Sequence, residues 1–302
     1  RSFQFGGTLE YKYQRLEIGY YLINRIGSLI NLSYQLLFLL IAMSSWIFVF
    51  KAFPKKIIPL FIFYLFCDEY FFWSMNGVRQ FFAITIFLFA LKYVIKRDCI
   101  KYVFLLLIAS LIHNSVLLFI ILYFIPFQKL YNQKVWYFII IISFFVSQSG
   151  LFLQLISSYL PLLLDNFSVF SKYSHFINTD KFAFDKTYSI GLGFYVRNAV
   201  SLIILYFSRN IINRVPESRL YFILFFIGVV VSNIFLTIIV IERLNMYFLI
   251  LRDFSLAIIT YYYWRDNKYI LVPIALLMLY FALFINAIFV SSNMCSPYDF
   301  RF

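Results

Sequence analysis

Residues 78–126 read VRQFFAITIFLFALKYVIKRDCIKYVFLLLIASLIHNSVLLFIILYFIP, and this stretch indicates the fold of the chain. An apolar run over 78–96 is followed by a basic group and then by two shorter apolar runs, 100–112 and 114–126. Continuous apolar runs of this kind are typical of helices in a lipid bilayer. They exclude an outer-membrane barrel, whose strands change character at every second residue.

The rest of the 302-residue chain has the same character. Hydrophobic residues make up 63% and charged residues 13%, whereas soluble domains have about 45–50% and about 25%. This composition excludes a soluble domain and a disordered chain. We therefore expect an all-α polytopic membrane protein with about ten membrane segments. The expected segments are 33–50, 57–73, 78–96, 100–112, 114–126, 135–155, 189–208, 220–240, 244–263 and 270–290.

The basic residues predict the orientation of the chain in the membrane. They gather between alternate pairs of segments, so that one side carries 14 Lys and Arg against three acids, and the other carries 12 against ten. Because cytoplasmic loops are enriched in Lys and Arg, the first side is predicted to be cytoplasmic. The net charge of +13 then reflects topology, and no nucleic-acid partner is expected.

The two runs 100–112 and 114–126 are too short to cross a bilayer separately. Each could form about 20 Å of helix, against a hydrocarbon core of about 30 Å. A hairpin that enters from the cytoplasm would therefore turn at His113-Asn114-Ser115, below the outer surface. The spacing predicts that His113 lies in a recess that opens outward.

Two further segments are not expected to span the membrane. Residues 16–31 place polar side chains on one arc and apolar ones on the rest, as in an amphipathic helix at the membrane interface. Residues 156–188 form a long outer loop, which at this length is usually functional or mobile. With no internal repeat in the sequence, we expect residues 1–302 to form a single integral membrane domain.

Charged and polar side chains at the outer ends of segments are the candidate site residues. Asn76 and Arg79 are three residues apart and are expected to share a helical face. Arg79 could bind an anion through its fork of donors, or could pair with Asp68 or Glu69 in an ordinary loop.

Arg197 is predicted to lie about eight residues inside its segment, where it either binds an anion or extends toward water. Glu242 and Arg243 stand at the outer mouth of the segment 244–263, and Arg243 is the better ligand candidate. Arg252 and Asp253 are expected to form a structural pair within the same segment.

His113 could simply cap a helix, but it shares the predicted outer side with Arg79, Arg197 and Arg243. Three guanidinium groups and a titratable imidazole suit a lipid-linked diphosphate substrate. The arginines would neutralise the diphosphate, and the imidazole could accept a hydroxyl proton.

Asn76-Gly77-Val78-Arg79-Gln80, followed by Ala109-Ser110-Leu111-Ile112-His113-Asn114-Ser115, resembles the EpsG/Wzy-type bacterial polysaccharide polymerases of O-antigen, capsule and exopolysaccharide assembly. Glu17-x-Gly19-Tyr20, Glu242-Arg243 with Tyr247, and Pro297-Tyr298 are also similar to the family pattern. The chain departs from that pattern at Gly7-Thr8-Leu9, where an acid is usual, and the family's first hydrophobic span is expected upstream of Arg1.

The resemblance implies a GT-C-like membrane glycosyltransferase on the outer face of the bacterial inner membrane. The growing glycan would be transferred from undecaprenyl diphosphate to the non-reducing end of an incoming lipid-linked repeat unit. By motif, Arg79 and Gln80 match the family's R-Q pair, His113 matches the hairpin histidine, and Arg243 matches the late arginine. His113 is the expected general base, with Glu242 and Glu69 as alternatives.

The expected partners are the undecaprenyl-diphosphate-linked oligosaccharide, membrane lipid and a chain-length regulator protein. The sequence contains no metal-ligand motif and no nucleotide-binding fingerprint, so neither a metal nor another cofactor is expected. Three other functions stay open: a lipid-linked oligosaccharide flippase or exporter, a membrane O-acyltransferase that acts on surface polysaccharide, and a scaffold subunit of a synthase complex.

Overall fold

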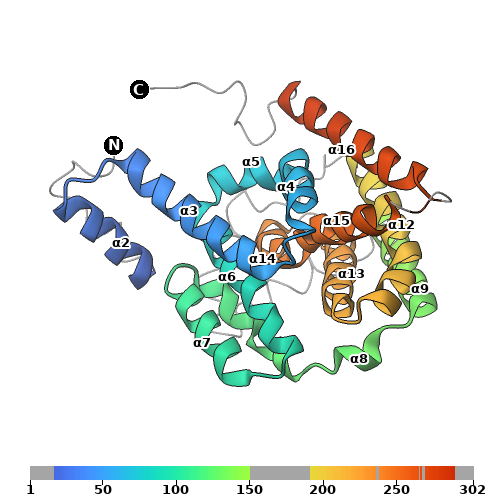
Figure 1. Cartoon of the computed structure of the whole chain (residues 1–302), viewed down its shortest axis with the longest axis horizontal. Helices are drawn as coiled ribbons and strands as arrows, with labels where there is room; N and C mark the ends of the chain where they lie inside the picture. Colours follow the sequence, from blue (N-terminus) through green and yellow to red (C-terminus); the bar gives the residue numbers. More distant parts are fainter. Residues whose placement is uncertain (1–16, 150–190, 236–237, 265, 267–268, 290–302) are drawn as a thin grey trace. The chain divides into compact units, whose positions relative to one another are not determined.

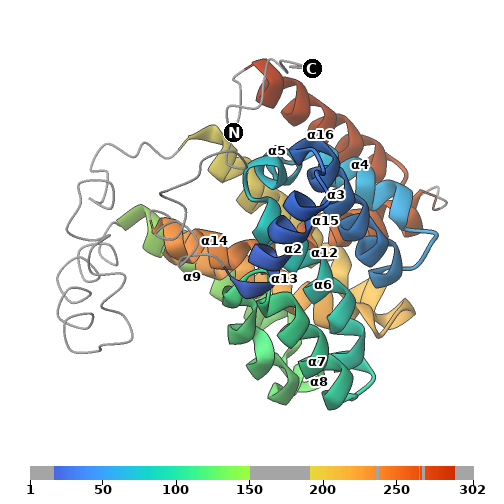
Figure 2. The same cartoon turned by 90° about the vertical axis from the view of Figure 1, so that its left-hand side faces the viewer.

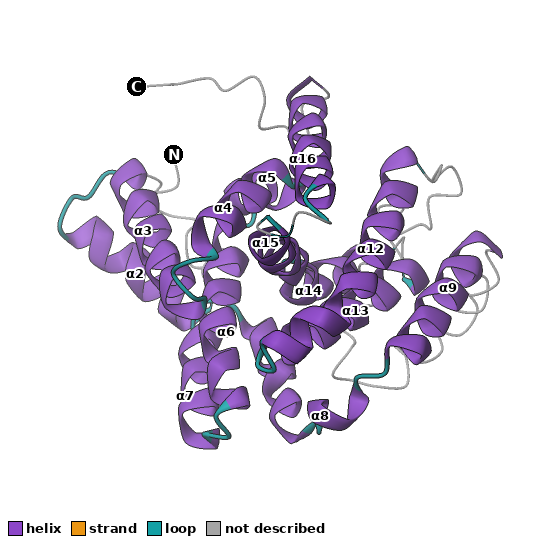
Figure 3. Ribbon diagram, turned by 45° about the vertical axis from the view of Figure 1, so that its right-hand side comes forward, coloured by secondary structure: helices purple, strands orange, loops and turns teal. Residues whose placement is uncertain are grey.

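The computed structural model describes residues 17–149, 191–235, 238–264, 266 and 269–289, and its described part is built from helices (Figure 1, Figure 3). The chain divides into two compact units, Arg1–Ile125 with Thr260–Phe302, and Pro126–Ile259, called unit 1 and unit 2 below. The prediction of one domain over 1–302 stays a prediction. The predicted outer loop 156–188 and the motifs at Gly7-Thr8-Leu9 and Pro297-Tyr298 lie outside the described residues.

Unit 1 contains the described helices that precede Ile125 and the last described helix of the chain. They are α2 (Ile18–Leu29), α3 (Tyr34–Ala52), α4 (Ile58–Cys67), α5 (Glu69–Asn76), α6 (Val78–Ile95), α7 (Cys99–Ser110), the 3₁₀ helix η1 (Asn114–Phe124) and α16 (Leu271–Phe289). Helix α6 packs against both α3 and α7 (Figure 2). Its central place follows from its sequence, because it is apolar around most of its circumference and buries ten of its residues.

Helix α3 shows why this unit belongs in a membrane. It buries a single stripe toward its neighbours, at Leu37, Ile41, Ser45, Val49 and Ala52. Its other faces expose apolar side chains, among them Leu39 at 54% and Met43 at 55%. In water such a surface would be costly, whereas lipid chains are an apolar solvent for it.

Four described helices are long and apolar enough to cross a bilayer: Tyr34–Ala52, Val78–Ile95, Ile241–Tyr263 and Leu271–Phe289. A fifth span is possible if α4 and α5, which meet at a bend of 73°, are counted together. The protein is therefore an integral membrane protein. The prediction of about ten segments is not supported, because several apolar runs form helices that are bent, short or too polar to be counted.

The segment predicted at 57–73 is one of these cases. Helix α4 ends at Cys67, Asp68 adopts an extended conformation, and α5 continues in a different direction. Two helices of unit 2 are also not counted as membrane spans. Helix α13 (Ser218–Ile234) is short, with 17 residues, and α12 (Leu192–Arg214) has 23 residues but carries polar and charged side chains along its length.

The predicted short hairpin is confirmed, with its turn where the sequence placed it. Helix α7 ends at Ser110, η1 begins at Asn114, and His113 lies between them. The second arm is a 3₁₀ helix, so side chains three residues apart are aligned. Val116, Phe119 and Leu122 accordingly form its buried stripe.

The ends of α3 and α6 bring basic residues together at one end of unit 1, and the orientation of the chain in the membrane stays a prediction. Lys51 and Lys92, near the C-terminal ends of these two helices, lie close enough to repel each other. Arg79 lies in the first turn of α6, at the opposite end. Unit 1 therefore has one basic end, and the candidate residue Arg79 lies away from it.

Unit 2 contains α8 (Phe127–Leu130), α9 (Gln133–Ser149), α12, α13, α14 (Ile239–Leu249) and most of α15 (Leu251–Tyr263). Helix α13 packs against α8, α9, α12 and α14 (Figure 3). The buried side chain of Asn233 on α13 donates to Ser143 Oγ at 3.0 Å and to Asn198 Oδ1 at 2.9 Å. These bonds join α13 to α9 and α12 where apolar packing alone would permit sliding.

Candidate functional site

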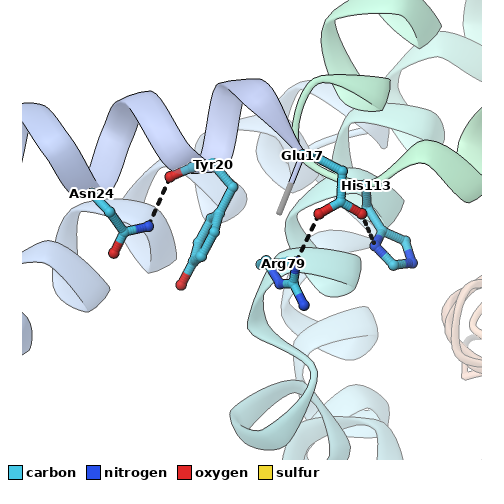
Figure 4. Close-up of polar contacts among 5 residues, drawn as sticks. All are labelled: Glu17, Tyr20, Asn24, Arg79 and His113. Atoms are coloured by element: carbon cyan, nitrogen blue, oxygen red, sulfur yellow. Dashed lines mark hydrogen bonds and ion pairs between the residues drawn. The ribbon is translucent and has the colours of Figure 1, made fainter. Parts of the chain in front are cut away.

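Glu17, Arg79 and His113 form a cluster of ionisable side chains in unit 1 (Figure 4). Glu17 Oε2 lies 2.7 Å from Arg79 Nη1, and Glu17 Oε1 lies 3.2 Å from His113 Nδ1. One carboxylate thus stands between a guanidinium group and an imidazole. The three residues come from three separate segments of the chain.

The backbone at the start of α2 brings Glu17 into this position. Glu17 precedes the first residue of α2, and the N–H groups of Gly19 and Tyr20 donate to the carbonyl oxygen of Leu111 at 2.8 Å and 3.2 Å. The first N–H groups of a helix have no partner within the helix, so Leu111 satisfies two of them. These bonds hold the start of α2 against Leu111, which precedes His113 by two residues in the chain.

Gly19 is required for this close approach. A Cβ atom at position 19 would lie 2.7 Å from both the Cβ atom and the carbonyl oxygen of Leu111. Such distances are far inside van der Waals contact. The glycine of the Glu17-x-Gly19-Tyr20 motif therefore has a steric role at the contact between α2 and the hairpin turn.

Arg79 has two partners, both from the start of α2. Besides the bond to Glu17, its guanidinium group lies over the ring of Tyr20, 5.2 Å from the centroid. A cation in the first turn of a helix is opposed by the positive end of the helix dipole. The Glu17 carboxylate and the face of the Tyr20 ring offset that cost. The Arg79 side chain remains 37% exposed.

His113 occupies the turn of the hairpin in an extended conformation, and its backbone N–H donates to Ala109. Its side chain is 26% exposed. Nδ1 is buried, and Glu17 is its ion-pair partner among the described residues, at an angle poor for a hydrogen bond. The sequence alternative that His113 caps a helix is not observed, because its side chain makes no capping bond to η1.

The electrostatic surroundings favour the ionised form of Glu17. Burial of the carboxyl group opposes ionisation, but the contact with His113, the backbone N–H of Glu17 and the charge of Arg79 outweigh it. Together they hold the pKa of Glu17 below its usual value of 4.5. The cluster therefore contains a carboxylate at neutral pH.

The structure brings together two of the predicted site residues, Arg79 and His113. Arg197 on α12, and Glu242 and Arg243 on α14, belong to unit 2. Glu242 and Arg243 are exposed. The convergence of all three arginines on one cavity stays a prediction.

The structure places Arg197 near the start of α12, and its depth in the membrane stays a prediction. Because α12 begins at Leu192, Arg197 is its sixth residue, about 8 Å from the start of the described helix. Arg252 and Asp253, the expected structural pair, are both buried, with 4% and 0% exposed.

The shared helical face of Asn76 and Arg79 is contradicted. Helix α5 ends at Asn76, Gly77 interrupts the helix, and α6 begins at Val78. Asn76 is exposed and Gln80 is buried, at 6%. Among the described side chains, the ion-pair partner of Arg79 is Glu17.

Glu17 is the residue of this cluster that sequence reasoning did not select. The sequence places it at the start of an amphipathic helix over 16–31, which the structure confirms as α2, and in a family-like motif without a chemical role. The Glu17-x-Gly19-Tyr20 motif was the available signal, because all three of its defined positions contact the Arg79 and His113 region.

Among the described residues, no group of three or more His, Cys, Asp or Glu side chains is close enough to hold a metal ion. The cluster can instead bind an anion through Arg79 and exchange a proton through His113.

Comparison with known proteins assigns the chain to a family. No curated protein and no solved structure matches it, so the expected likeness to GT-C-like enzymes has no support from a known structure. The model of the EpsG family matches residues 2–300, which is nearly the whole chain. The chain therefore belongs to the EpsG family, which is linked to polysaccharide biosynthesis.

Proposed function

We propose that this protein is a glycosyltransferase that polymerises lipid-linked oligosaccharide repeat units in the bacterial inner membrane. It transfers the growing glycan from undecaprenyl diphosphate to the non-reducing end of an incoming lipid-linked repeat unit, on the outer face. The observation that carries the proposal is the pairing of Arg79 with His113 through Glu17, away from the basic end of unit 1. Family membership supports the same class of chemistry.

The reaction needs a proton acceptor and a group that stabilises a departing diphosphate. An acceptor hydroxyl attacks the anomeric carbon of the donor glycan, the bond from that carbon to the diphosphate oxygen breaks, and undecaprenyl diphosphate leaves. His113 Nε2 takes the hydroxyl proton. Arg79 stabilises the charge that develops on the leaving diphosphate.

The contacts of Arg79 leave it able to stabilise the charge on the leaving diphosphate. Its described polar bond uses only Nη1, a guanidinium group has five N–H donors, and more than a third of the side chain is exposed. We propose that Arg197, Arg243, Glu242, Asn76 and Gln80 contribute further contacts to the diphosphate or to the glycan. The lipid-linked diphosphate supplies the free energy, so the reaction needs no nucleotide.

The surface of α2 supports a lipid-linked substrate. Its outward side exposes Ile18 at 64%, Leu22 at 48%, Ile26 at 57% and Leu29 at 73%. These positions recur every three or four residues and form one apolar stripe. A helix of this type lies in the membrane interface, at the level where the headgroup of a lipid-linked sugar is found. Glu17 stands at the first turn of that helix.

The decisive experiment supplies purified, lipid-reconstituted protein with lipid-linked repeat units and no nucleotide or acyl donor. A polymerase produces a ladder of longer lipid-linked glycans and releases undecaprenyl diphosphate. We expect Arg79→Ala and His113→Ala to lose the ladder, and Arg197→Ala to weaken it.

Arg25→Ala is the matched control, because Arg25 is exposed on α2 and bonds only to Tyr21 among the described residues. It should retain the ladder. Movement of intact repeat units across the bilayer without chain growth would instead identify a flippase. Transfer of an acyl group from a supplied donor to a hydroxyl of the repeat unit, without chain growth, would identify an O-acyltransferase.

A further inference from the structure

We infer that Glu17 is a positioning residue that fixes the tautomer and orientation of the His113 imidazole. This inference rests on the proposed function, in which His113 accepts the proton of the acceptor hydroxyl. Its structural basis is the contact of Glu17 Oε1 with His113 Nδ1 at 3.2 Å, made while Oε2 of the same carboxylate holds Arg79 at 2.7 Å.

The chemistry of the two groups assigns the proton on the neutral imidazole. An ionised carboxylate has only acceptors, so the ring nitrogen that faces it is favoured as the N–H. The proton then lies on Nδ1, and the lone pair lies on Nε2. In Figure 4 the Nδ1 side of the ring faces Glu17, and no hydrogen bond to Nε2 is formed within the described part of the chain.

The surroundings of Glu17 suit an orienting role. Its side chain is only 12% exposed, and the lowered pKa keeps it ionised at the pH where an imidazole base works. When His113 takes a proton it becomes a cation, and the carboxylate at Oε1 stabilises that cation. Arg79 and Glu17 are the charged groups that face this region within the described residues.

Attachment of α2 to the hairpin does not depend on this carboxylate alone. The backbone bonds from Gly19 and Tyr20 to Leu111 already fix the start of the helix beside the turn. The Glu17 carboxylate therefore orients side chains at an interface that the backbone bonds already hold together. For this reason Glu17→Gln should fold, while the charge that orients His113 is removed.

The test compares wild type, Glu17→Gln and Glu17→Ala in the reconstituted polymerisation assay at neutral pH. We expect Glu17→Gln to keep normal abundance and to lose about 10- to 100-fold in rate, because the imidazole is no longer held in its working orientation. Glu217 is an acid in unit 2, and the matched control Glu217→Gln should leave the rate unchanged.

A second measurement reads the ring directly and does not require activity. Nitrogen NMR of protein labelled at its two histidines, with His113→Gln used for assignment, should show protonated Nδ1 and unprotonated Nε2 in wild type. Glu17→Ala should shift the population toward the other tautomer. An unchanged tautomer would overturn the inference even if polymerisation is confirmed, and so would a Glu17→Gln enzyme that polymerises at the wild-type rate. An inactive wild type with the expected tautomer would overturn the proposed function and leave the Glu17 contact established.

Discussion

The substitution Gly19→Ala tests the contact between α2 and the hairpin with the smallest possible change. The new methyl group would lie 2.7 Å from both Leu111 Cβ and the Leu111 carbonyl oxygen, whereas ordinary contact begins at 3.4 Å. The helix and the turn must therefore separate by about 0.7 Å, at a typical overpacking cost of about 1–3 kcal/mol. The same movement would draw Glu17 away from the hairpin turn, where its Oε1 atom now lies 3.2 Å from His113 Nδ1.

Gly27→Ala is the matched control on the same helix. There the new methyl group meets Leu37 Cδ1 at 3.5 Å, which is ordinary contact, and alanine improves helix propensity by up to about 1 kcal/mol. Thermal unfolding in detergent should show a lower midpoint for Gly19→Ala and an equal or higher midpoint for Gly27→Ala. If the two variants have the same midpoint and the same polymerisation rate, the close approach of α2 to Leu111 is wrong.

Two further predictions concern a buried network and a carboxylate. Asn233→Leu removes the donor that Ser143 and Asn198 share, so unit 2 should lose about 1–3 kcal/mol in a thermal unfolding assay. Leucine in place of Gln128, an exposed residue of α8, should leave the midpoint in place, and equal midpoints for both variants would refute the network. Because the pKa of Glu17 is lowered, its ionised form stabilises the fold above about pH 4.5, and that stabilisation is lost as the pH falls through the lowered pKa. Wild type should therefore unfold at a higher temperature than Glu17→Gln at pH 6, with the difference disappearing in acid; a difference that persists in acid would contradict this assignment.

The parts of the structure that depend on local length and polarity could be predicted from the sequence. Two runs too short for a bilayer and the polar group between them located the hairpin turn at His113. The amphipathic pattern over 16–31 located α2. Both patterns lie within one segment of chain, where periodicity and length are reliable physical signals.

The features that the sequence does not predict depend on contacts between distant segments or on weak local signals. Glu17 reaches Arg79 across 62 residues, and neither helix pattern indicates that partnership. Gly77 lies between the predicted segments 57–73 and 78–96, and the three-residue spacing of Asn76 and Arg79 does not reveal that the helix is interrupted there. The three-residue spacing of Val116, Phe119 and Leu122 was present in the sequence, but apolar residues on every side concealed it.

The three segments of the Glu17 cluster also set an order of events during synthesis. Residues 17, 79 and 113 leave the ribosome in that order, and at about 5–20 residues per second His113 follows Glu17 by about 5–20 s. Until then the carboxylate and the guanidinium must stay hydrated, because burying either one alone in lipid is costly. The cluster thus forms only once the hairpin 100–126 has entered the membrane. In a nascent chain arrested before that hairpin, α2 lacks the Leu111 carbonyl to which its first N–H groups bind.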